Sequence, residues 1–166
     1  MANQPDNFFI KLKEMCLRCG VKLFYTPKLT GAPVSGSTRW INNTPVIQLT
    51  ARYRQNDRFW FTFFHEAGHI LLHGKKYISL ENVNFSGADP EKEQEAHEFA
   101  EQWIFSKKQE KEVVSALPLT EQEIIDYAEK FNTHPAMIIG RLQHLKLITF
   151  NQGREFIVPI DLNRDA

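Results

Sequence analysis

The sequence predicts a single α+β domain in which a small N-terminal antiparallel sheet precedes a long apolar helix, a glutamate-bearing helix and a C-terminal helical pair. The chain has 166 residues, of which 42% are hydrophobic, and this is enough for one compact core. Short runs with strand character lie before residue 50, whereas helical periodicity dominates after residue 58. Because no repeat, low-complexity tract or linker divides the chain, we assign residues 1–166 to one domain.

The N-terminal region, residues 8–50, is expected to contain one helix and the sheet. Apolar residues from Phe8 to Cys19 recur on one helical face, and Gly20 follows them. The stretch VKLFYTP predicts a strand. The runs TRWI and PVIQL predict two strands that pair as a hairpin, while the Pro- and Gly-rich segment 26–37 predicts a loop.

Two helices are expected within residues 58–106, where we place the active site. The first runs from Arg58 to Leu72 and stops at Gly74, because its length and its C-terminal glycine favour a buried helix over a strand. A loop, residues 75–89, follows. Pro90 suits a first helical turn, and EKEQEAHEFAEQWIFSKKQ predicts one amphipathic helix.

The C-terminal part predicts a helical pair and a final strand. The pair spans residues 120–147, and a Thr120-to-Glu123 capping box opens its first helix. The stretch REFIVPI, residues 154–160, predicts a terminal strand.

The charge balance argues against nucleic acid as the main partner. Twenty basic residues offset twenty acidic ones, so the sequence has no excess of positive charge that would attract nucleic acid. The helical pair has helix-turn-helix length, but the basic groups of its second helix are only Arg141, His144 and Lys146. We therefore expect this pair to pack or to dock a protein, and we expect no strong nucleic-acid binding.

Membrane association is not expected either. No apolar stretch reaches the roughly 18 residues of a membrane-spanning helix, and the first residues lack the basic-then-apolar order of a signal peptide. We expect a cytoplasmic protein. The pair Cys16 and Cys19 lacks the further cysteines of a zinc site, so small structural thiols are favoured over a redox pair.

The stretch FWFTFFHEAGHILLHGKK places titratable groups in a helix that is otherwise apolar. His65 and His69 are four residues apart, so both imidazoles share one helical face and can bind one Zn²⁺ per chain. Glu66, between them, can take a proton from water, which makes it the candidate general base. The HExxH pattern therefore predicts a catalytic zinc site; the alternative is a helix whose polar face meets solvent.

A third ligand is expected on the helix after Pro90. Glu93 aligns with Ala96 and Ala100 on the apolar face, whereas Glu95 aligns with Phe99. We favour Glu93 as the ligand and keep Glu95 as the alternative.

Two further histidines lie near the expected site. His97, one turn after Glu93, is a candidate second-shell or oxyanion-stabilising group. His73, one turn after His69, is either such a group or an ordinary helix-end residue favoured by the C-terminal dipole.

The order of WINNTPVIQLTARYRQNDRFWFTFFHEAGHILLHGKK, EKEQEAHEFAEQWI and FNTHPAMIIGRLQHLKLI resembles the ImmA/IrrE metallopeptidase family. The resemblance covers residues 21 to 147 and extends to the peptidase-like domain of HigA-type and Xre-type regulators. It implies a zincin-like, more narrowly gluzincin-like, fold. Carried over to this sequence, zinc would be held by His65, His69 and Glu93, with Glu66 as the base.

The resemblance also implies a function. Members cut helix-turn-helix repressors and so derepress phage, mobile-element or stress genes, which makes a zinc endopeptidase with a repressor substrate the leading expectation. A non-catalytic, antitoxin-like or sensor module that binds a protein partner is the alternative. A small-molecule zinc hydrolase is a third class.

Overall fold

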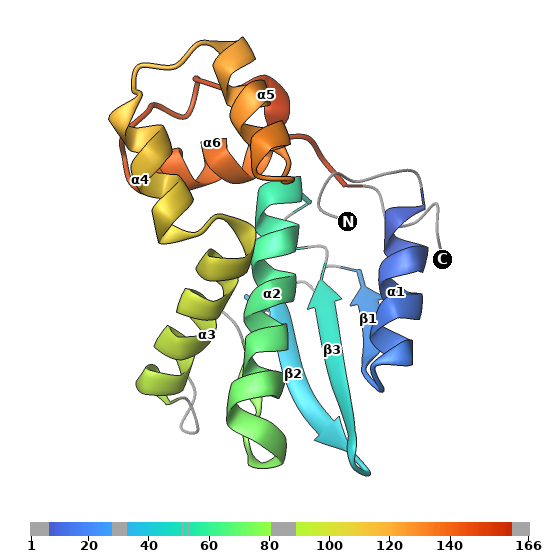
Figure 1. Ribbon diagram of the computed structural model, residues 1–166. Helices are drawn as coiled ribbons and strands as arrows, with labels where there is room; N and C mark the ends of the chain where they lie inside the picture. Colours follow the sequence, from blue (N-terminus) through green and yellow to red (C-terminus); the bar gives the residue numbers. More distant parts are fainter. Residues whose placement is uncertain (1–6, 28–32, 51, 53, 81–88, 161–166) are drawn as a thin grey trace.

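The computed structural model describes residues 7–27, 33–50, 52, 54–80 and 89–160. This part of the chain forms six α-helices, two 3-10 helices and a four-stranded sheet, which confirms the α+β class (Figure 1). The helices are α1 (Phe8–Arg18), α2 (Asn56–His73), α3 (Pro90–Ile104), α4 (Lys107–Ser115), α5 (Glu121–Lys130), α6 (Pro135–His144), η1 (Gly74–Lys76) and η2 (Arg154–Phe156). The strands are β1 (Lys22–Thr26), β2 (Gly36–Ile41), β3 (Thr44–Thr50) and β4 (Ser79–Leu80). The predicted loops lie partly outside the described residues, at positions 28–32 and 81–88.

The sheet is mixed, with strand order β1-β3-β2-β4. β3 pairs antiparallel with β2 and parallel with β1, and β4 pairs antiparallel with β2. The expectation of a purely antiparallel N-terminal sheet is therefore wrong. The direction of β1 depends on a partner more than twenty residues away, and β4 follows α2 in the chain, so local sequence pattern could reveal neither.

The predicted hairpin is confirmed in β2 and β3. Its turn residues Asn42 and Asn43 have φ values of 46° and 68°. A two-residue type I′ turn requires positive φ at both central positions, and Asn tolerates this better than most residues with a side chain.

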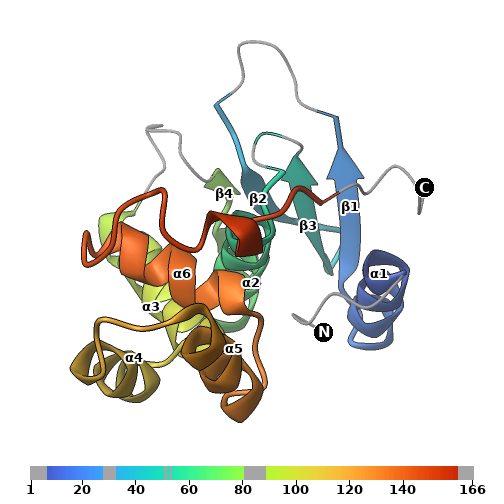
Figure 2. The same ribbon diagram turned by 90° about the horizontal axis from the view of Figure 1, so that it is seen from above.

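α1 and α2 pack on the same face of the sheet (Figure 2). Their aromatic rings meet edge to face, with centroids 5.6 Å apart for Phe8 and Phe59 and 6.2 Å apart for Phe9 and Phe59. Ile47 and Leu49 of β3 close this core from the sheet side. The packing fixes the position of α2 and leaves a second face of that helix for α3.

Small residues allow α2 and α3 to approach closely. A Cβ on Gly68 would lie 3.3 Å from Ala96 Cα and 3.2 Å from the ring of Phe99, so even a methyl group there would crowd α3. Ala96 and Ala100 are fully buried in the same contact. The polar side chains of the two helices are therefore held at short range.

The helix predicted from residue 91 to residue 109 is in fact two helices. α3 ends at Ile104, Phe105 is extended, and Ser106 begins α4 by capping the backbone N–H of Gln109. Phe105 is thereby buried with Val113 in a second core that includes α5 and α6. The spacing of Ser106 and Gln109 is that of a capping box, which marks the start of a new helix. The amphipathic pattern alone does not show this helix boundary.

The capping box predicted for α5 is present. The hydroxyl of Thr120 accepts from the backbone N–H of Glu123 at 3.3 Å, and the Glu123 carboxylate accepts from the backbone N–H of Thr120 at 2.7 Å. α4, α5 and α6 lie together beyond the N-terminal end of α2 (Figure 1).

The terminal strand predicted for residues 154–160 is not formed. Residues Arg154–Phe156 are a 3-10 helix that starts after Gly153, whose φ is 69°. Only an isolated bridge between Gln55 and Pro159 remains of the expected pairing. Proline has no N–H to donate to a ladder, which limits further pairing at this point.

Asn56 at the start of α2 holds this tail. Its side-chain Nδ2 donates to the carbonyl of Phe156 at 3.0 Å, and its Oδ1 accepts from the backbone N–H groups of Val158 at 3.2 Å and Asp57 at 3.0 Å. Asn56 is completely buried. One side chain therefore satisfies three backbone groups.

Asn56→Ala is expected to lower the free energy of unfolding by about 1–3 kcal/mol, because buried backbone groups would lose their partners. Urea unfolding followed by circular dichroism measures the change. The matched control is Gln122→Ala, whose exposed amide donates to Asp126 on its own helix, and this change should stay within about 0.5 kcal/mol. Equal losses in the two variants would contradict the role assigned to Asn56.

The two cysteines occupy different environments. Cys16 packs in the first core, and burial together with the neighbouring Cys19 raises the pKa of its thiol to about 11. Cys19 is exposed. In the described residues, no helix is both long enough and apolar enough to cross a membrane.

Candidate metal centre and cleft

His65 and His69 lie on the face of α2 that meets α3. Their Nε2 atoms are 3.1 Å apart, and the two residues are 4% and 1% exposed. One helical turn between them produces this arrangement, as the spacing of the motif predicts.

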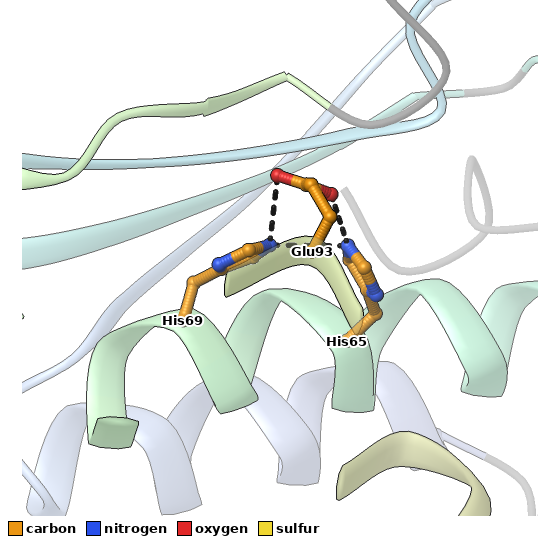
Figure 3. Close-up of side chains that lie close together, drawn as sticks. All are labelled: His65, His69 and Glu93. Atoms are coloured by element: carbon orange, nitrogen blue, oxygen red, sulfur yellow. Dashed lines mark hydrogen bonds and ion pairs between the residues drawn. The ribbon is translucent and has the colours of Figure 1, made fainter. Parts of the chain in front are cut away.

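The first turns of α3 bring Glu93 to the two histidines. Asp89 caps this helix by accepting from the backbone N–H groups of Glu91 and Lys92, and Pro90 occupies its first turn. The carboxylate of Glu93 spans both rings, with Oε2 at 3.2 Å from His65 Nε2 and Oε1 at 3.4 Å from His69 Nε2 (Figure 3).

The second candidate, Glu95, lies elsewhere. Its Oε2 is 2.9 Å from Nε2 of His73, and the side chain is 62% exposed. The structure thus places Glu93, and not Glu95, beside His65 and His69.

The electrostatics of the cluster favour a negative carboxylate. Burial alone would raise the pKa of Glu93, but hydrogen bonds from His65, His69 and Tyr77 outweigh it and hold the pKa well below the usual range. Burial lowers the pKa of His69, which keeps its ring neutral. The carboxylate form of Glu93 and the neutral ring of His69 are the protonation states that a divalent cation requires of such ligands.

The donor spacing fits a tetrahedral ion. Ligand atoms about 2.0–2.1 Å from a tetrahedral centre lie roughly 3.3 Å from one another. The donor atoms of His65, His69 and Glu93 all lie within 4.8 Å of one another, and each nitrogen–nitrogen or nitrogen–oxygen contact between them measures 3.1–3.4 Å. The three residues therefore fit a divalent cation such as zinc.

Glu66 points toward strand β2. It is completely buried, and its Oε2 accepts from the hydroxyl of Thr38 at 2.6 Å. A Cβ on Gly36 would lie 2.8 Å from Glu66 Oε1 and 2.5 Å from Thr62, so the strand can pass over the carboxylate only because residue 36 is glycine. Strand β2 thus fixes the orientation of the carboxylate next to His65.

Tyr77 contacts two of the three candidate ligands. Its hydroxyl donates to Glu93 Oε1 at 2.6 Å, and its ring centroid lies 5.0 Å from that of His69. Burial and the hydrogen bond to Glu93 raise the pKa of the phenol, so the hydroxyl keeps its proton and remains a donor.

His97 lies beside the cluster and contacts Glu101 and Phe61. Its Nε2 is 3.2 Å from Glu101 Oε1, and its ring meets the edge of Phe61 at 4.8 Å. Burial lowers the pKa of His97, which favours the neutral ring. His97 is therefore available as a hydrogen-bonding group close to His65 and Glu93, but in this structure its partner is Glu101.

A cleft of about 750 Å³ opens at the cluster. It is lined by α2, α3 and α6, and residues shared with the site are His65, Glu93 and His97. Aromatic and aliphatic groups line much of the rest, among them Phe61, Ile104, Phe105, Met137 and Phe150. A cleft of this size can accept several atoms of a peptide next to the candidate metal position.

Sequence reasoning missed Gly36, Thr38 and Tyr77. Each is remote from the HExxH motif in sequence or carries no local pattern, and each reaches the site only through tertiary packing. Gly36 falls in the segment 26–37, for which the sequence predicts a loop, so the meaning of a strand glycine, which often marks a close approach of another element, could not be read from the sequence.

Residues 16–143 match the family model Peptidase_M78, described as the IrrE N-terminal-like domain. No curated protein matches the chain.

Proposed function

Because the chain belongs to the Peptidase_M78 family of IrrE N-terminal-like domains, we propose that it is a zinc-dependent endopeptidase that cleaves a helix-turn-helix transcriptional repressor in the cytoplasm. Family membership makes the chain a metallopeptidase, and a metallopeptidase acts on protein with the help of a metal. The proposal adds the identity of the metal, the residues that hold and use it, and the class of substrate.

The spacing of three donors carries the proposal. His65, His69 and Glu93 present two nitrogens and a carboxylate at the separations that a tetrahedral ion needs, and these are ligand types that zinc accepts. Three protein ligands also leave one position for water or substrate, which is typical of a catalytic site rather than a structural one.

In this proposal the chain's own residues move the proton and position the substrate. Zinc would polarise the scissile carbonyl and make water more acidic. Glu66 accepts the proton of the attacking water and delivers it to the leaving amine, while Thr38 keeps one carboxylate oxygen in place. His97, at the cleft wall, is the candidate donor to the developing oxyanion.

The role of α6 favours a protein substrate over DNA. Met137, Gly140 and His144 of this helix line the cleft. Arg141 pairs with Glu101 of α3 and with Glu110 of α4, so its positive charge is neutralised within the fold. The second helix of the helix-turn-helix-like pair is therefore better suited to contact a peptide in the cleft than to contact phosphate.

We expect a repressor encoded beside this gene to be cut once, in a segment outside its DNA-binding helices. The reason is that only an extended peptide can lay its amide across the metal cluster. The two proteins are mixed with Zn²⁺ or with a chelator, and the repressor is followed by intact mass. Cleavage with zinc and none with the chelator supports the proposal.

Two other results would contradict it. Stable association without cleavage under every metal condition indicates a non-catalytic, antitoxin-like regulatory module. Tight, sequence-specific DNA binding by this chain alone would contradict both protein-directed functions.

A further inference from the structure

A chain of hydrogen bonds runs from the surface of α3 to one of the candidate ligands. Glu95 Oε2 lies 2.9 Å from His73 Nε2, and His73 Nδ1 lies 2.9 Å from His69 Nδ1. The other nitrogen of His69, Nε2, faces His65 and Glu93. His69 therefore contacts the other two candidate ligands on one side and His73 on the other.

The two nitrogens between His69 and His73 must share one proton. If His69 binds a metal through Nε2, its proton is on Nδ1, and His73 Nδ1 has to accept it. The proton of a neutral His73 is then on Nε2, where the carboxylate of Glu95 accepts it. In this arrangement every N–H group in the series from His69 through His73 to Glu95 meets an acceptor.

When His73 is neutral, the opposite direction of these hydrogen bonds fails at both ends. A proton on His73 Nδ1 that is donated to His69 would move the His69 proton to Nε2, where it would block ligation. The same change would leave a lone pair of His73 Nε2 facing the carboxylate of Glu95 at 2.9 Å, and two acceptors in contact repel each other. The charge of Glu95 thus selects the direction that leaves His69 Nε2 free to bind.

His73, the middle residue of these hydrogen bonds, is shielded from solvent. The side chain of His73 is 3% exposed, although the residue lies at the last position of α2. The ring of Tyr77 packs against both imidazoles, with centroids 5.0 Å from His69 and 5.5 Å from His73. A helix-end histidine that only favoured the helix dipole would have no need of such burial.

We propose that His73 and Glu95 are positioning residues that fix the tautomer and ring orientation of His69 for metal binding. This inference rests on the metal site of the proposed function, but it concerns the affinity of that site and not cleavage. A ligand histidine is commonly oriented by a direct hydrogen bond to a carboxylate or carbonyl. In this protein the carboxylate of Glu95 lies near solvent, and His73 stands between it and His69.

Zinc affinity tests the inference directly. The dissociation constant is measured by competition with a chromophoric chelator, with no substrate present. We expect His73→Phe, which keeps a ring in the same space but cannot hydrogen-bond, to weaken zinc binding about 10- to 100-fold. His73→Asn should restore affinity close to that of the wild type, because its Oδ1 stands where Nδ1 of histidine stands and can accept from His69.

The carboxylate is tested with matched variants on α3. Glu95→Ala and Glu95→Gln should both weaken binding, though less than His73→Phe does, because neither side chain excludes the opposite direction: alanine cannot accept from His73, and the glutamine amide can turn its NH2 group toward His73 Nε2. Glu98→Ala is the control, because this exposed carboxylate bonds to Gln94 and lies outside the chain of hydrogen bonds.

Nitrogen NMR of the zinc-loaded wild type gives a second readout that needs no variant to fold. We expect His73 to be protonated on Nε2 and unprotonated on Nδ1. Wild-type affinity in folded His73→Phe, or a proton on His73 Nδ1 in the zinc-loaded protein, would overturn the inference while leaving the proposed function intact. Failure of the wild type to bind zinc would overturn both, whereas zinc binding without cleavage would count against the proposed function alone.

Discussion

Glu66→Gln is expected to reduce repressor cleavage by about 100- to 10,000-fold, which is the usual contribution of a positioned general base. The amide cannot take a proton from water at neutral pH. It has nearly the same shape as the carboxylate, and its oxygen can still accept from the hydroxyl of Thr38. The fold and the three candidate ligands are therefore preserved, and zinc content should remain that of the wild type.

Single-turnover cleavage and metal analysis on the same preparation separate these two effects. Glu98→Gln is a matched control because it makes the same chemical change on an exposed side chain of α3. It should cleave at the wild-type rate. If Glu66→Gln also cleaves at that rate, Glu66 is not the base; if it loses zinc, Glu66 contributes to holding the metal.

Much of the candidate site follows from helical geometry. A spacing of four residues brings His65 and His69 to one face of α2, whatever the remainder of the fold. The apolar stripe of α3 also has a definite phase, set by Ala96 and Ala100, which predicts that Glu93 faces inward and Glu95 does not. Periodicity therefore anticipates which side chains the structure brings together.

The remaining contacts depend on where separate segments meet. Thr38 is 28 residues before Glu66, and Tyr77 is 16 residues before Glu93, so no local pattern relates them. The same reason explains the missed β4 strand, which is only two residues long and is defined by its pairing with β2. A short apolar tail after Gly153 resembles a strand in sequence, but it is held instead by the side chain of Asn56.

Loss of one ligand is expected to have the largest effect on the metal. The wild type should carry about one Zn²⁺ per chain, because three donors converge on one position. His65→Ala and His69→Ala should each weaken zinc binding by more than about 100-fold, since losing even an outer partner of a ligand costs about 10- to 100-fold. Glu93→Gln replaces a charged ligand oxygen with a neutral one and should also weaken zinc binding.

The control must separate loss of metal from loss of stability. His134→Ala removes a histidine whose Nδ1 caps α6 by accepting from the backbone N–H of Ala136 at 3.1 Å, remote from the candidate ligands. It should lower the free energy of unfolding by about 1 kcal/mol and leave zinc content unchanged. The ligand variants should show the reverse pattern: their zinc content should fall, while their stability without zinc should stay close to that of the wild type. Added zinc should stabilise the wild type by about 4 kcal/mol at a zinc concentration 1,000 times the dissociation constant, and it should not stabilise the ligand variants, because zinc stabilises only a fold that binds it. If zinc raises the melting temperature of His69→Ala as much as that of the wild type, the metal is bound elsewhere; if Glu95→Gln loses zinc while Glu93→Gln keeps it, the third ligand is Glu95.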